Sequence, residues 1–153
     1  VNMAGYSKTP LVKKIGIQAG MRGICLHIPP EVRRLFAPAP IQFAKKLSGT
    51  FDYIHLFSTD PRALHKDFVQ AKKFLKPAGM LWVSWPKAGK LGTSINENTV
   101  REIGLAAGLV DIKVAAIDAL WSGLKFVYRL SDRKRGVLNP VKPTPARPRS
   151  KSP

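Results

Sequence analysis

The chain is short of several features that define common protein classes. Its one cysteine, Cys25, excludes an internal disulfide and fits a reducing compartment. No apolar run approaches the roughly 20 residues that a membrane-spanning helix needs. No N-terminal segment combines a basic start, a long apolar run and a small-residue cleavage site. We therefore expect a cytoplasmic protein without a membrane span.

Acidic residues are also scarce. The chain has 26 Lys and Arg against nine Asp and Glu, for a net charge of +17. The excess is not confined to the C-terminal segment, because the body of the chain is basic too. Such a charge favours an anionic partner, such as nucleic acid, an acidic protein or an acidic lipid surface. A basic surface that merely keeps the protein dissolved is the alternative reading of the same charge.

The first fifty residues predict short elements. Thr9 and Pro10 are typical of a helix start, and this helix would end near Gly16 or Gly20. An apolar stretch between Gly20 and Pro29 predicts a buried strand over Met21 to Ile28. We further expect a short helix over Pro30 to Phe36 and a short edge strand over Ile41 to Lys45.

The stretch from Phe51 to Lys87 carries the clearest pattern. Phe51 to Ser58 is apolar on both faces, as in a parallel strand with helices on each side. Asp60 and Pro61 then provide an N-cap and a first helical residue. The helical spacing of Leu64, Phe68, Ala71 and Leu75 predicts a core-facing stripe. We expect Pro77 and Gly79 to end this helix and Met80 to Ser84 to form the next strand.

The remaining chain predicts one helix and two strands. Two capping boxes compete for the helix start, Ser94 with Glu97 and Thr99 with Glu102, and Gly108 is a natural stop. Alternating residues predict an antiparallel pair, Val110 to Asp118 and Leu124 to Leu130, joined through residues 119–123. We expect one domain over residues 1–130 and a disordered, basic, Pro-rich tail over residues 131–153.

The order of these elements resembles a class I S-adenosylmethionine methyltransferase, in which a strand–helix–glycine–strand unit precedes a helix and a terminal antiparallel pair. The resemblance implies an α/β fold of three layers: a methyltransferase-like (Rossmann-like), mostly parallel sheet that ends in an antiparallel pair. More closely, the chain is similar to a small bacterial family known only as a domain of unknown function, which implies no activity. The matching residues are Ala4-Gly5-Tyr6-Ser7, Thr9-Pro10-Leu11, Trp85-Pro86-Lys87, Gly108-Leu109-Val110-Asp111, Lys113-Val114, Ile117-Asp118 and Trp121-Ser122-Gly123-Leu124. Members of that family often carry Cys at the position of Ala115 and Thr at that of Leu120, and this chain departs from both.

The cofactor half of such a fold has changed. A nucleotide or S-adenosylmethionine site needs glycines after the first strand, where backbone approaches the ligand. This chain has Ile28-Pro29-Pro30 there, and the two prolines remove two backbone donors. The acidic residue expected after the second strand is missing between Ile41 and Thr50. We therefore expect no cofactor, and S-adenosylmethionine is the one that the fold would otherwise suggest.

The carboxyl ends of the strands are where ligands bind in open α/β sheets. The candidate ligand-binding residues there, or in the turn of the terminal pair, are Thr59, Asp60, Trp85, Lys87, Lys90 and Trp121. Each has a structural alternative: Asp60 as a helix cap, the lysines as solvated charges, and the tryptophans as packing residues. His27 and His55 fall in predicted strands and fit satisfied core or rim histidines. No catalytic group and no metal-ligand spacing can be assigned.

Three functions remain open. The leading hypothesis is a non-enzymatic binding or interaction module on a methyltransferase-like scaffold without the glycine-rich loop. The first alternative is a methyltransferase, or another nucleotide-dependent transferase, with an unorthodox cofactor site. The second is a nucleic-acid-binding protein that acts through its basic body and tail.

Overall fold

The strands form one six-stranded sheet in a computed structural model that describes residues 10–135. The strand order is β2-β1-β3-β4-β6-β5, and the first four strands of the chain run parallel. Strand β6 is antiparallel to both of its neighbours, β4 and β5. The bounds are β1 (Gly23–Leu26), β2 (Phe43–Ala44), β3 (Phe51–Phe57), β4 (Leu75–Pro86), β5 (Leu109–Ala116) and β6 (Trp121–Tyr128). The predicted α/β fold, with a mostly parallel sheet ending in an antiparallel pair, is confirmed.

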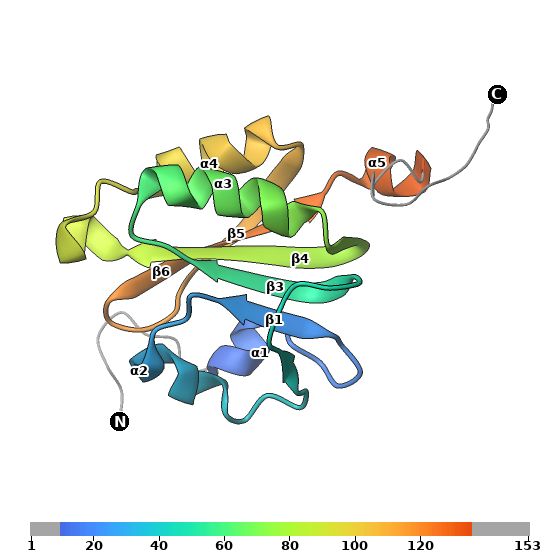
Figure 1. Ribbon diagram of the computed structural model, residues 1–153, viewed down its shortest axis with the longest axis horizontal. Coiled ribbons are helices and arrows are strands. Elements are labelled where there is room, and N and C mark those ends of the chain that lie inside the picture. The colour runs from blue at the N-terminus through green and yellow to red at the C-terminus, as the bar shows by residue number, and fades with distance from the viewer. Residues whose placement is uncertain (1–9, 136–153) are drawn as a thin grey trace.

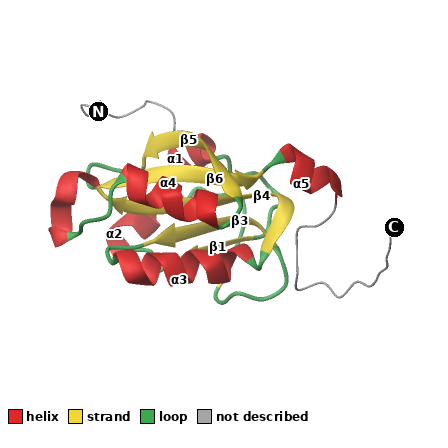
Figure 2. Cartoon of the chain, turned by 90° about the horizontal axis from the view of Figure 1, so that it is seen from above, coloured by secondary structure: helices red, strands yellow, loops and turns green. Residues whose placement is uncertain are grey.

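Helices cover both faces of the sheet (Figure 1). Helices α3 (Pro61–Lys72) and α4 (Glu97–Ala106) lie side by side on one face, as the view from above also shows (Figure 2). Helices α1 (Leu11–Ile15) and α2 (Pro30–Arg33), with the 3-10 turn η1 (Arg34–Phe36), lie on the other face. The irregular segment η2 (Lys87–Gly92) follows β4, and α5 (Leu130–Arg135) projects beyond the sheet.

The core has two halves, one on each side of the sheet. The α3–α4 half contains Ile54 and Leu56 of β3, and the α1–α2 half contains Tyr53 and Phe57 of the same strand. All four side chains are buried, so β3 has both faces covered, as its double apolar pattern predicts.

Helix α3 begins as the sequence predicts and ends earlier. The Asp60 carboxylate accepts a hydrogen bond from the Arg62 amide (3.1 Å), and Pro61 occupies the first turn. The prediction that Pro77 and Gly79 end the helix is wrong, because α3 ends at Lys72 and both residues lie inside β4. Leu75 already pairs with Phe51, and the register then jumps, so the intervening residues form an irregular bulge.

The last third of the chain departs from the prediction at its caps and turns. Asn96 caps α4 by accepting a hydrogen bond from the Thr99 amide (2.9 Å), so neither predicted capping box forms. Strand β6 begins at Trp121 rather than Leu124, which shortens the connection from β5. Residues 131–135, predicted as tail, form most of α5, while the rest of the predicted tail lies outside the described residues. The motif Ala4-Gly5-Tyr6-Ser7 and the predicted cap Thr9 also lie outside the described residues.

Candidate functional site

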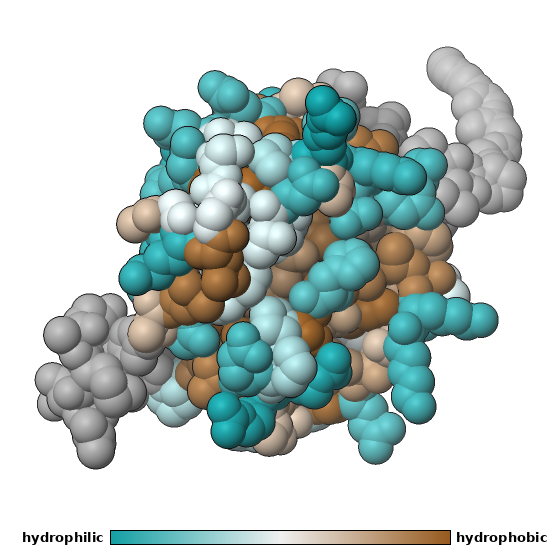
Figure 3. All heavy atoms as spheres, turned by 60° about the vertical axis from the view of Figure 1, so that its left-hand side comes forward, coloured by the Kyte–Doolittle hydropathy of each residue, from teal (hydrophilic) through white to brown (hydrophobic). Residues whose placement is uncertain are grey.

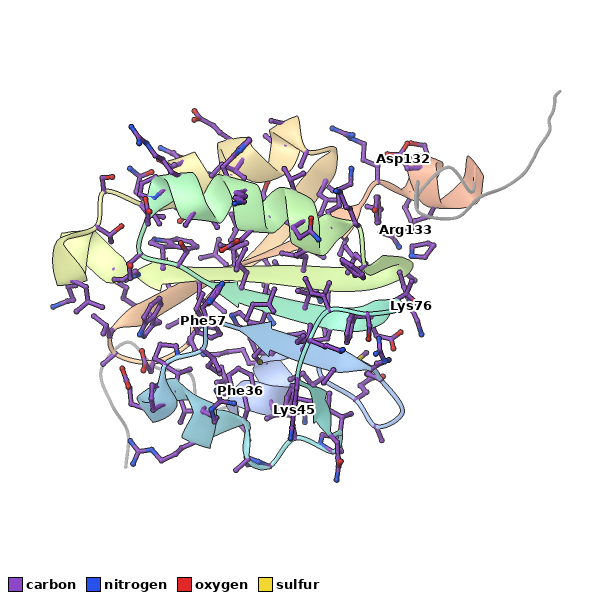
Figure 4. The ribbon with its side chains drawn as sticks, viewed as in Figure 1. Phe36, Lys45, Phe57, Lys76, Asp132 and Arg133 are labelled. Carbon is purple, nitrogen blue, oxygen red and sulfur yellow. The ribbon has the colours of Figure 1, made fainter. Side chains whose placement is uncertain are left out.

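A crevice opens where the carboxyl ends of β1 and β3 meet, the point at which successive connections leave for opposite faces of the sheet. Phe57, at the end of β3, lies at this edge in Figure 4. Figure 3 brings the same side forward and shows hydrophilic residues around smaller hydrophobic areas. The crevice measures about 330 Å³ and is lined by His27, Phe57, Ser58, Thr59, Asp60, Ala63 and Asp67.

His27 gives this crevice its distinctive chemistry. The residue follows β1 with a left-handed backbone (φ 60°), a conformation that glycine adopts without steric cost. Its exposed imidazole Nε2 lies 3.4 Å from the Oδ2 atom of Asp67 on α3. The prediction that His27 lies in a strand is wrong, because β1 ends at Leu26 and the backbone turns there, whereas its position at the rim of the sheet agrees with the prediction.

The segment after His27 is packed rather than open. Ile28, Val32 and Phe36 are buried in the core half under α1 and α2. Pro29 has an extended backbone and precedes α2, whose first residue is Pro30. In place of a glycine loop whose amides could hold a phosphate, the chain inserts side chains into the core at this point. The carboxylates of Asp60 and Asp67 further disfavour an anionic group in the crevice.

The six candidate residues separate into three groups. Thr59 and Asp60 line the crevice together, with Asp60 also serving as the cap of α3. Lys87 and Lys90 belong to η2 and do not line it. Trp85 is 4% exposed and packs in the α3–α4 half of the core, which leaves no free ring face for stacking on a ligand.

Trp121 is also buried, at 4% exposure, so its interpretation as a contact residue in an exposed turn is corrected. Its ring packs edge-on against Phe57, with 5.5 Å between centroids. The tight turn before it buries the ring: Asp118 Oδ1 accepts hydrogen bonds from the Leu120 amide (2.9 Å) and the Trp121 amide (2.7 Å). Its indole Nε1 is the one buried side-chain polar atom without a partner among the described residues.

A cluster of three lysines lies on the α1 side of the antiparallel strands. Lys113 of β5 and Lys125 of β6 are direct cross-strand partners, and Lys113 Nζ donates a hydrogen bond to the Lys14 carbonyl (2.8 Å). Burial, then the positive charges of Lys113 and Lys87, lower the pKa of the Lys14 ammonium group. Burial and the charge of Lys113 lower the pKa of Lys125. Burial is the larger cause of both shifts, and the positive charge of Lys113 adds to it at each site.

Carboxylates near basic groups lie elsewhere in the described chain. Asp52 pairs with Lys76 (3.3 Å), and Asp132 lies 3.9 Å from Arg129. Glu97 and Asp111 both pair with Arg101. Across residues 10–135, no ion pair involves a member of the lysine cluster. The only sign of this cluster in the sequence is the net charge of the chain. The three lysines are distant in the sequence, and they come together only through the pairing of β5 with β6 and the position of α1.

Polar side chains on strands β1, β3 and β4 form a connected line in the core. Tyr53 Oη lies 2.6 Å from His55 Nδ1, and His55 Nε2 lies 2.7 Å from Ser84 Oγ. The Cys25 thiol lies 4.0 Å from Tyr53 Oη. Burial lowers the pKa of His55 to about 3, so its ring is neutral at physiological pH. Since His55 and Ser84 are fully buried, we interpret them as core residues with satisfied hydrogen bonds, as predicted for His55.

No group of three or more His, Cys, Asp or Glu side chains in residues 10–135 could hold a metal ion. None of the helices within the same residues has the length and apolar character to cross a bilayer.

The strand order and the two helical layers define a methyltransferase-like α/β fold, which is shared with solved methyltransferases. The ribosomal protein L11 methylase from Lactobacillus delbrueckii subsp. bulgaricus is 11% identical, with 78% of this chain and 75% of that one covered and a TM-score of 0.51. The precorrin-6y C5,15-methyltransferase from Geobacter metallireducens GS-15 is 8% identical, with 81% and 93% covered and a TM-score of 0.52. The magnesium protoporphyrin IX methyltransferase from Synechocystis PCC 6803 is 12% identical, with 65% of this chain and 51% of that one covered and a TM-score of 0.48. This chain therefore spans about half the length of that methyltransferase.

The chain belongs to the family described as protein of unknown function (DUF3052), whose model matches residues 49–130. No curated protein matches the chain. Its membership carries no established activity, and the distant methyltransferases share its fold alone.

Several residues that carry the family resemblance lie around the end of β4. Pro86 pairs with Trp121 across the β4–β6 ladder, and Trp85 pairs with Ser122. Gly123 is needed for close packing, because a Cβ there would lie 2.9 Å from Ile117 Cδ1 and 3.2 Å from a Trp82 ring atom. These motif residues therefore build the terminal strand pair, whereas the crevice is formed largely by residues outside the motifs.

Proposed function

We propose that this protein is a non-enzymatic binding module that engages an anionic partner through the lysine cluster of Lys14, Lys113 and Lys125. The observation that carries the proposal is the direct pairing of Lys113 with Lys125, without an acidic partner for either in the described residues. Like charges opposite each other in a sheet destabilise it. A bound anion would relieve that repulsion.

One of the three ammonium groups has a local structural role. Lys113 donates to a carbonyl near the C-terminal end of α1, where a cation is favourable. Lys14 and Lys125 have no comparable hydrogen bond among the described residues. The repulsion between the groups is therefore only partly offset within the protein, which supports an external anion as their partner.

The phosphate backbone of a nucleic acid is the partner whose chemistry fits best. The net charge of +17 attracts a polyanion at long range. The exposed large hydrophobic residues in the described chain are all aliphatic, among them Leu91, Ile112 and Val114, so no aromatic ring is offered for stacking on bases. The proposal is thus for backbone recognition without sequence preference.

The test is fluorescence anisotropy with labelled duplex and single-stranded oligonucleotides over a range of salt concentrations. A variant with Lys14→Gln, Lys113→Gln and Lys125→Gln should bind duplex at least about tenfold more weakly, and its log–log salt slope should fall by about 2 to 3. The matched control replaces three exposed lysines elsewhere, Lys45→Gln, Lys46→Gln and Lys66→Gln, at equal net charge. Equal loss in the two variants would contradict a specific role for the cluster, and binding of an acidic polypeptide alone would assign the surface to a protein partner.

A second candidate function is transfer chemistry at the strand-end crevice, and the exposed His27–Asp67 pair favours it. Thr59 and Asp60 would then contact the ligand, and S-adenosylmethionine would bind without a glycine loop. Calorimetric titration with S-adenosylmethionine distinguishes the two candidates. Tight binding that is lost in Asp60→Asn and His27→Ala variants would support the transferase and overturn the non-enzymatic proposal. The non-enzymatic proposal predicts no binding.

A further inference from the structure

A second hollow, of about 470 Å³, lies between the α2–η1 segment and strands β1 and β2. It shares none of its lining residues with the strand-end crevice. Ile28, Phe36, Ile41 and Phe43 give it an apolar lining, and Phe36 lies between η1 and the sheet in Figure 4. Its volume and its apolar character are those of a site for a small organic molecule.

Two arginines supply the charge of this pocket. Arg33 and Arg34 are successive residues at the junction of α2 and η1, and both line the pocket while their side chains remain exposed. Neither side chain takes part in an ion pair or a hydrogen bond within the described chain, although both backbones do. No carboxylate is present among the residues that line the pocket. An apolar cavity with two unpaired guanidinium groups is complementary to a molecule with an apolar body and one anionic end.

We propose that this pocket binds a small carboxylic acid with an aromatic or aliphatic body. The body occupies the space lined by Phe36, Ile41 and Phe43, and the carboxylate meets Arg33 and Arg34. A guanidinium group binds a carboxylate through two parallel hydrogen bonds, so it selects this head group over a neutral amide of the same shape. This site shares no residue with the lysine cluster, of which Lys113 and Lys125 lie at the other edge of the sheet, on β5 and β6.

Cys25 makes the pocket directly observable. The residue lines the cavity, and it is the single cysteine of the chain. Burial raises the pKa of its thiol to about 12, so the group remains a neutral thiol and does not repel a bound carboxylate. Only the thiolate reacts with an alkylating reagent, so the reaction of Cys25 is slow and is followed at alkaline pH. A ligand in the pocket should slow it further, and Cys25 is the single thiol of the chain that contributes to the signal.

The experiment titrates the full chain with benzoate, 2-naphthoate and decanoate, and with the corresponding primary amides. Calorimetry gives the affinity, and the rate of Cys25 alkylation by iodoacetamide gives the location. We expect at least one acid to bind at least about tenfold more tightly than its amide and to slow alkylation at least about fivefold at saturation.

Two variants and one control assign the affinity to the pocket. Arg33→Gln with Arg34→Gln should remove the preference for the acid, and Ala37→Trp should weaken acid and amide together by narrowing the cavity that Ala37 lines. Arg62→Gln, an exposed arginine on α3, should change neither affinity. Circular dichroism checks that each variant is folded. The proposal is overturned if no acid in the panel binds better than its amide, if binding leaves Cys25 alkylation unchanged, or if Arg62→Gln has the same effect as the paired variant.

Discussion

The Nε2 atom of His55 lies 2.7 Å from the Oγ atom of Ser84, and both side chains are fully buried between β3 and β4. The other ring nitrogen, Nδ1, lies 2.6 Å from Tyr53 Oη, so both nitrogens have a partner in either neutral tautomer. The ring also stacks on Phe57, with 4.3 Å between centroids. A serine next to a histidine suggests a nucleophile, but here the pair is sealed in the core and the histidine is neutral. The buried His55–Ser84 pair therefore affects the stability of the folded protein.

That burial makes the stability of the protein depend on pH. The pKa of His55 is about 3 in the folded protein, against an ordinary value of 6.5. The unfolded chain therefore binds a proton that the folded protein does not, at every pH between these values. The stability that the neutral, buried His55 contributes to the fold is fully present above pH 6.5. It is lost as the pH falls towards 3, by about 1.4 kcal/mol per pH unit.

Chemical denaturation of the wild type and of His55→Gln, from about pH 7 to about pH 4, measures this effect. The variant is expected to be less stable at neutral pH, because an amide cannot reproduce both hydrogen bonds. Its stability should then fall less steeply with acid, and the difference in slope isolates His55 from carboxylates that titrate in both proteins. Parallel profiles would show that the imidazole binds a proton as readily in the folded protein as in the unfolded chain, which would contradict the lowered pKa.

Gly104 allows α4 to approach the sheet. A Cβ on Gly104 would lie 2.0 Å from the Cε1 atom of Phe126 on β6, far inside contact distance. Alanine is the better helix former by about 1 kcal/mol, but forcing its methyl group into this contact costs more. We expect Gly104→Ala to reduce the free energy of unfolding by about 1–3 kcal/mol.

The steric origin of that loss can be separated from helix propensity. Phe126→Leu removes the ring that the methyl group would meet, at the cost of a smaller core side chain. In a double-mutant cycle measured by urea denaturation, the two changes should cost less together than the sum of their separate effects. Additive costs would contradict the contact.

Local patterns determined much of the fold. The double apolar pattern of Phe51 to Phe57 and the Asp60-Pro61 start of α3 are short-range signals, and both are confirmed. The errors occur where tertiary contacts override such signals. Pro77 and Gly79 are common helix terminators, yet the pairing of Leu75 with Phe51 draws this segment into β4.

The candidate sites were harder to predict for the same reason. Thr59 and Asp60 were found because the edge of a parallel sheet is a general ligand position, and they do line the crevice. The sequence did not indicate that His27 lines the crevice, because its left-handed backbone angle cannot be read from its neighbours in the sequence. The lysine cluster depends on the register that places Lys113 opposite Lys125, and an arrangement of three distant segments leaves no local pattern.

The left-handed backbone of His27 leads to an unusual order of stability between two variants. Both His27→Gly and His27→Ala remove the imidazole and its contact with Asp67, so they differ only in the backbone. At φ 60° an alanine Cβ is strained, while glycine is not. We expect the glycine variant to be the more stable by about 1 kcal/mol in urea denaturation, although glycine is usually the less stable choice because it increases the entropy of the unfolded chain. An alanine variant of equal or higher stability would contradict this conformation.

Asp118 fixes the turn between β5 and β6 by accepting hydrogen bonds from the amides of Leu120 and Trp121. Asp118→Ala removes the acceptor, so both amides lose their partner and the free energy of unfolding should fall by about 1–2 kcal/mol. Asp118→Asn keeps a side-chain oxygen at the same position and should retain most of the stability. Urea denaturation followed by far-UV circular dichroism measures both variants. The same loss in both would mean that the charge of Asp118, rather than its hydrogen bonds, stabilises the turn that buries Trp121.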